Sequence, residues 1–204
     1  MITNKYAQDY RLENRVNAKG KTVTKTVYVG KYYTFDRTPE KMRAEKRILL
    51  IAAVCALAML ALGAGVYNNQ GFSSQYYTLV PFLVCAFPLL YLGMALYSVF
   101  TFKGKCTREQ KDHISERIPK CGFAGMVFSG AGVIGILIST GLKIAGVEER
   151  PVHANDIIFM TAAVLMFLAF LVVFLRRKAF LMKEINKPDV PAEPAEGDPQ
   201  TPKN

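Results

Sequence analysis

Four long stretches of this 204-residue sequence contain no Asp, Glu, Lys, Arg or His. They cover residues 48–67, 77–100, 121–142 and 157–175. A helix rises about 1.5 Å per residue, so each stretch is roughly 30 Å long as a helix and matches the hydrocarbon core of a bilayer. A buried helix of a soluble protein is usually shorter and carries a polar face. We therefore interpret the four stretches as membrane-spanning helices.

The same stretches lack the alternation of polar and apolar residues that is typical of a membrane β-barrel, and they are longer than ordinary strands. Only internally bonded backbone is stable in lipid, which leaves helices. The predicted fold is an all-α integral membrane protein, a bundle of four transmembrane helices. The first 40 residues are polar and charged, so no secretory signal is expected and the amino end should stay in the cytoplasm.

Residue types that carry catalysis are scarce. The chain has only two His and no Gly-rich phosphate loop. Its spans hold no ionisable side chain, whereas membrane enzymes and ion-coupled carriers usually place such groups near the bilayer core. Cys106, His113 and Cys121 match no paired zinc motif and lack a fourth ligand. We expect no enzyme activity, no catalytic residue, no cofactor and no metal site.

The distribution of Lys and Arg predicts the orientation. Of the 26 Lys and Arg, 24 lie in residues 1–47, 101–120 and 176–204. Cytoplasmic loops retain cations, and four spans place these three segments on one side, so both termini are predicted to be cytoplasmic. The net charge of +10 then faces an anionic inner leaflet, and no nucleic-acid partner is needed to explain it. This pattern is compatible with a cell membrane, specifically the bacterial inner membrane.

Basic residues beside the first and fourth spans are expected to form a collar that contacts anionic lipid. The collar comprises Lys41, Arg43, Lys46, Arg47, Arg176, Arg177 and Lys178.

Small residues in the third span predict close helix packing, because they let another backbone approach. The expected packing positions are Gly125, Ser129, Ala131, Gly135 and Ser139, with Ala61 and Gly65 on the first span as their neighbours. The fourth span has fewer small residues and is expected to face more lipid. In the second span, Pro88 frees the carbonyl of Val84 and predicts a kink.

Three segments make up the predicted domain organisation. Residues 1–37 alternate polar and apolar side chains and predict a cytoplasmic β-meander of two or three strands, which is too small to be stable alone. Residues 38–185 form the transmembrane domain, whose first helix begins after Thr38 as N-cap with Pro39 in the first turn. Residues 186–204 hold five of the ten prolines and are predicted to be a disordered cytoplasmic tail.

Two functions remain open at this point. The first is a non-enzymatic accessory or scaffold subunit that binds a protein partner or a second copy of itself through the meander, the basic loop and the small-residue face of the third span. The alternative is a homo-oligomeric transporter or channel subunit for a small uncharged solute. Its path would follow the hydroxyls of Ser129, Ser139 and Thr140 and the kink at Pro88.

Overall fold

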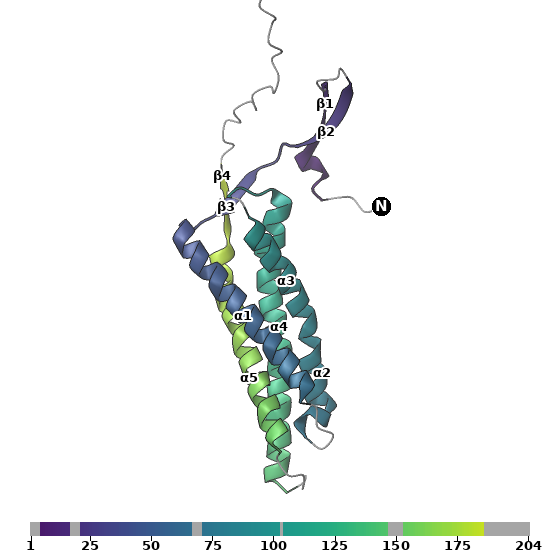
Figure 1. Ribbon diagram of the computed structural model, residues 1–204, viewed down its shortest axis with the longest axis vertical. Coiled ribbons are helices and arrows are strands. Elements are labelled where there is room, and N and C mark those ends of the chain that lie inside the picture. The colour runs from purple at the N-terminus through teal and green to yellow at the C-terminus, as the bar shows by residue number, and fades with distance from the viewer. Residues whose placement is uncertain (1–4, 17–20, 67–70, 103, 147–152, 186–204) are drawn as a thin grey trace, which may run out of the picture.

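The computed structural model describes residues 5–16, 21–66, 71–102, 104–146 and 153–185. Its long helices lie side by side as a bundle (Figure 1). They are α1 (Pro39–Gly65), α2 (Tyr76–Val84) followed by α3 (Ala86–Thr101), α4 (Arg108–Ile144) and α5 (Ala154–Leu175). Among these described residues, and with α2 and α3 taken as one span, four helices are long and apolar enough to cross a membrane. The prediction of four such helices is confirmed.

The helix starts follow local signals in the sequence. α1 begins at Pro39 after Thr38, where proline loses no intrahelical hydrogen bond. α4 begins with a capping box, in which the side chains of Thr107 and Gln110 each accept a hydrogen bond from the other's backbone N–H. This cap lies well before the uncharged stretch at 121–142, so α4 includes the charged residues 108–120 and is the longest helix.

The buried face of α4 is a stripe of mostly small residues packed inside the chain. Gly125, Ser129, Gly132, Gly135 and Ser139 are all buried, at spacings of three or four residues. A Cβ atom added at Gly135 would lie 2.8 Å from the carbonyl oxygen of Tyr77, which shows how closely α2 approaches. Ala131, by contrast, is exposed, because it follows Ser129 by two residues and precedes Gly132 by one, spacings that turn it away from the buried stripe. Its predicted place in the packing face is wrong.

The predicted contact between the first and third spans is also wrong. α4 packs against α2, α3 and α5, whereas α1 packs mainly on α5 and on α3. Ala61 and Gly65 are exposed, because the buried side of α1 runs through Leu49, Ala52 and Ala56 to Gly63. The small residue that α1 uses is Gly63, which lies directly against the ring of Phe82.

α5 is not the lipid-facing helix that its composition predicted. It lies between α1 and α4, and Phe159, Met166 and Phe170 are fully buried. The reason lies on α4: Gly125 has no side chain, and the ring of Phe170 occupies that space. Large aromatic residues on one helix therefore complement small residues on its neighbour.

The second span is interrupted at Cys85, three residues before Pro88. The N–H of Cys85 donates to the carbonyl of Phe82 at 3.3 Å, and the helix resumes with Leu89 N–H donating to Cys85 O at 3.2 Å. Pro88 has no N–H to donate to Val84, so the backbone bonding changes at this turn. The break lies where a kink from Pro88 is expected.

In the described part of the chain, four short strands form two sheets, so the third strand expected in the meander belongs to a different sheet. β1 (Tyr10–Val16) and β2 (Thr22–Tyr28) form an antiparallel hairpin. β3 (Tyr32–Phe35) leaves the hairpin and pairs antiparallel with β4 (Met182–Ile185), which follows α5. Burial explains the difference, because Tyr33 and Phe35 of β3 are buried beside the bundle while the hairpin stays exposed. Residues 186–204, predicted to be disordered, lie outside the described residues.

Candidate functional site

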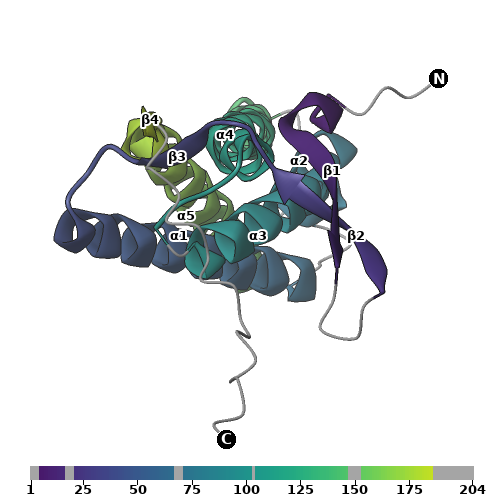
Figure 2. The same ribbon diagram turned by 90° about the horizontal axis from the view of Figure 1, so that it is seen from above.

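The polar and charged groups of interest gather at one end of the bundle, which we call the basic end. It is the end where α1 and α4 begin, α3 and α5 finish, and both small sheets lie (Figures 1 and 2). The predicted collar and the predicted meander both belong to it.

β3 is the structural centre of the basic end. One edge pairs with β4, and on the other side Tyr33 and Cys106 exchange two backbone hydrogen bonds of 3.0 Å. The Cys106 thiol is buried, with its Sγ 3.4 Å from both Tyr33 O and Met182 Sδ. Burial raises the pKa of Cys106 to about 11, so the thiol is neutral near pH 7 and serves as a packing group.

Glu45 connects three parts of the basic end. This buried carboxylate accepts from Arg37 at 2.9 Å and from Arg176 at 3.1 Å, both at Oε1. It thereby links the loop before α1, α1 itself and the end of α5. Sequence reasoning did not identify Glu45, because the collar was defined by its cations and this buried carboxylate lies among them.

Several predicted collar residues make contacts within the chain. Lys46 donates from Nζ to the carbonyl of Val99 at 2.6 Å, and the guanidinium of Arg177 lies 3.7 Å from the ring centre of Phe174. Arg176 is paired with Glu45. The remaining members are exposed: Lys41, Arg43, Arg47 and Lys178. Lipid contact by the collar stays a prediction, and these exposed residues are best placed for it.

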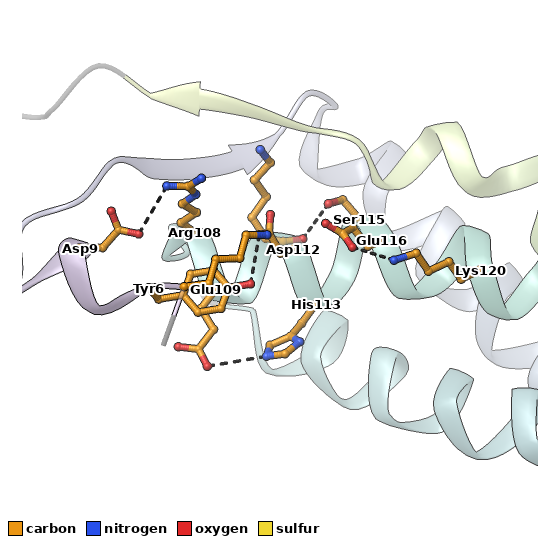
Figure 3. A network of polar contacts seen from close by, with 11 residues as sticks. Tyr6, Asp9, Arg108, Glu109, Asp112, His113, Ser115, Glu116 and Lys120 are labelled. Atoms are coloured by element: carbon orange, nitrogen blue, oxygen red, sulfur yellow. Dashed lines mark hydrogen bonds and ion pairs between the residues drawn. The ribbon is translucent and has the colours of Figure 1, made fainter. Parts of the chain in front are cut away.

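A row of polar contacts ties the segment before β1 to the first turns of α4 (Figure 3). Asp112 accepts from Lys5 at 3.0 Å and from the hydroxyl of Tyr6 at 3.1 Å. Asp9 lies 4.0 Å from Arg108. The hydrogen bond to Asp112 raises the pKa of Lys5, and desolvation raises that of Tyr6. Because the cations Lys5 and Arg108 remain exposed to solvent, these pairs position the segment more than they stabilise the bundle.

Tyr28 anchors the β1–β2 hairpin. Its hydroxyl donates to Lys31 O at 2.8 Å and accepts from the backbone N–H of Arg108 at 2.9 Å. Beyond this anchor the hairpin extends away from the bundle (Figure 1), with Leu12 70% and Val23 50% exposed. The chain therefore presents the hairpin on a fixed base.

At the opposite end of the bundle, a buried carboxylate joins the start of α5 to the loop before α2. Asp156 accepts from the N–H of Phe72 at 2.9 Å and from that of His153 at 3.1 Å. The ammonium of Lys143 lies 4.4 Å from the ring centre of Phe72. These contacts start α5 and hold the loop before α2 against it.

In the part of the chain that the structure describes, no group of three His, Cys, Asp or Glu side chains is placed to hold a metal ion. Comparison of the chain with models of protein families, with curated proteins and with solved structures finds no match.

Proposed function

We propose that this chain is a multi-pass membrane protein that acts as a non-enzymatic accessory or scaffold subunit and binds a protein partner at its basic end. Its four long apolar helices are compatible with membrane insertion. The concentration of Lys and Arg beside the basic end supports a cytoplasmic location for that end and for both termini.

The exposed hairpin is the observation that carries the proposal. β1 and β2 form a sheet of two strands only, so neither outer edge is paired among the described residues. Unpaired edges can add a strand from another chain, and a hairpin alone is at best marginally stable. An extended segment of a partner protein, paired with one edge, would satisfy the backbone and cover apolar side chains such as Leu12.

The small-residue face of α4 no longer supports partner binding. Its residues are buried against α2 and α5 of the same chain, as Gly125 against Phe170 illustrates. The proposed interface is therefore restricted to the basic end.

The same packing weakens the transport alternative. Ser129 and Ser139 are buried between helices, and the Ser129 hydroxyl donates to Gly125 O at 2.6 Å. Thr140 likewise donates to Ile136 O of its own helix at 2.8 Å. The hydroxyls of Ser129 and Thr140 are occupied within their own helix and Ser139 is buried, so no observation favours a path along them.

Photo-crosslinking in the native membrane tests the proposal. A photoreactive residue at Lys25, which is exposed on β2, should yield an adduct with one other protein, whereas the same residue at Asn155 at the opposite end should not. Adducts at Lys25 with lipid alone, or equal protein adducts at both positions, would contradict the proposed interface. Adducts with a second copy of the chain alone would replace the accessory role by self-association.

A further inference from the structure

The charged part of α4 lies beside an apolar part of α3. Phe87 and Tyr91 of α3 line the same cavity as Arg117 and Lys120 of α4. Yet residues 77–100, which include that part of α3, contain no Asp, Glu, Lys, Arg or His. Tyr91 is nine residues, or roughly 14 Å along the helix, before Phe100 at the end of that apolar stretch, so the cavity that Arg117 and Lys120 line reaches well into it.

The other charged groups of the basic end lie nearer to that end. Lys46 bonds to Val99, and Arg176 bonds to Glu45 one residue away from Lys46. The α4 charges are therefore offset toward the middle of the bundle. This offset is not visible in the sequence, where the uncharged stretch of α4 begins only at residue 121.

The cavity between α3 and α4 is amphipathic and has a volume of about 490 Å³. Its basic-end portion is lined by charged residues that include Asp112, Glu116 and Arg117. Its other portion is lined by Phe87, Pro88, Tyr91, Ala124 and Phe128. A polar group and a hydrocarbon chain that are joined in one molecule match these two portions.

Ion pairing among the described charged residues that line the cavity leaves one cation without a counter-ion. Lys120 forms an ion pair of 2.8 Å with Glu116, and Lys5 one of 3.0 Å with Asp112. Arg117 is half-buried and forms no ion pair or hydrogen bond with the described residues. A guanidinium at the level of an apolar helix is costly without an anion, and its planar donors suit a phosphate in two-point geometry.

We propose that the groove between α3 and α4 binds one anionic phospholipid from the surrounding leaflet. The phosphate accepts hydrogen bonds from Arg117, and an acyl chain lies along Phe87, Tyr91 and Phe128. Because the two internal ion pairs cancel, the single remaining positive charge complements a headgroup of net charge −1. This site is separate from the exposed collar and does not depend on the proposed hairpin partner.

Lipid retention by the full chain tests this proposal. The protein is purified in nanodiscs of phosphatidylcholine with a minor fraction of phosphatidylglycerol, and the lipid that stays bound on transfer to detergent is counted by native mass spectrometry. We expect one retained phosphatidylglycerol. Arg117→Gln removes the charge-assisted contact to the phosphate and should reduce the apparent affinity for phosphatidylglycerol about tenfold, while Arg117→Lys retains part of that affinity.

Two further variants separate the groove from general charge and from misfolding. Lys105→Gln removes an exposed cation that belongs neither to the collar nor to the groove and should leave retention unchanged. Ala124→Leu narrows the apolar portion with Arg117 intact and should also weaken retention. Equal retention of both lipids, or an equal loss in Lys105→Gln and Arg117→Gln, would overturn the proposal. Displacement of the lipid by inorganic phosphate alone would show a free-anion site instead.

Discussion

Replacing Gly135 by Ala should destabilise the bundle, although alanine is the better helix former. The new Cβ would lie 2.8 Å from the carbonyl oxygen of Tyr77 and 3.0 Å from the hydroxyl of Thr78, where ordinary contacts begin at 3.4 Å. The nearest obstacle is backbone, so α2 as a whole must shift. Overpacking of this kind costs about 1–3 kcal/mol, and the gain in helix propensity is at most about 1 kcal/mol. We expect a net loss of roughly 1 kcal/mol, within a range of about 0 to 2 kcal/mol, in the free energy of unfolding.

Two glycines of the same helix serve as matched controls. A Cβ at Gly132 would have its nearest neighbour, Thr78 O, at 3.7 Å, and one at Gly141 would meet nothing within 4 Å. Both alanine variants keep the helix-propensity gain without the clash, so they should be neutral or more stable by up to about 1 kcal/mol.

The assay is unfolding of the detergent-solubilised chain by increasing amounts of SDS, followed by a distance probe between α2 and α4. Gly135→Ala should unfold at a lower SDS fraction than the wild type, and Gly132→Ala and Gly141→Ala should not. Equal midpoints for Gly132→Ala and Gly135→Ala would refute the close approach of α2. A Gly135→Ala variant that loses an oligomer but keeps its midpoint would mean that the stripe packs between chains.

Three further predictions concern the basic end. Glu45→Gln removes the shared acceptor of Arg37 and Arg176 and should cost about 1 kcal/mol, since both arginines remain partly solvated. Glu40→Gln, on the exposed first turn of α1, should cost only about 0.3 kcal/mol from its contact with the helix dipole, and SDS midpoints check both. Tyr28→Phe removes two hydrogen bonds, at about 1 kcal/mol per bond, and should speed amide exchange in the β1–β2 hairpin by up to roughly thirtyfold, while Tyr32→Phe should not. Unchanged exchange in Tyr28→Phe would contradict the anchor. With the other three cysteines replaced by Ser, the rate of alkylation of Cys106 in the folded chain should rise with pH up to about pH 11, because the thiolate forms only as pH approaches the raised pKa. In denaturant the rate should level off near the usual pKa of a thiol. A plateau near pH 9 in both states would show that the thiol is not buried.

The four long helices were predictable because long apolar stretches without charge have few physical solutions. The start of α1 at Pro39 followed from capping chemistry in the same way. Which face of a helix packs, and on which neighbour, depends on the rotation of whole helices. Spacing of small residues suggested Ala61 and Gly65, yet Gly63 carries the contact because Phe82 of α2 lies there.

The basic end was less predictable, because its contacts join residues that are far apart along the chain. β3 pairs with β4 about 150 residues later, and Arg176 reaches Glu45 across 131 residues. The charge pattern correctly marked the region as distinct from the spans. It could not show that Arg117 of α4 and Tyr91 of α3 line one cavity, since that depends on the offset between two antiparallel helices.

Labelling from both sides of a sealed membrane tests the central claim, that four helices cross a bilayer and leave the basic end in the cytoplasm. In a background with its four cysteines replaced by Ser, Lys25→Cys and Asn155→Cys are each exposed to a membrane-impermeant thiol reagent in intact cells and in inverted vesicles. We predict that position 25 reacts only in inverted vesicles and position 155 only in intact cells. Reaction of both positions from the same side would contradict the account.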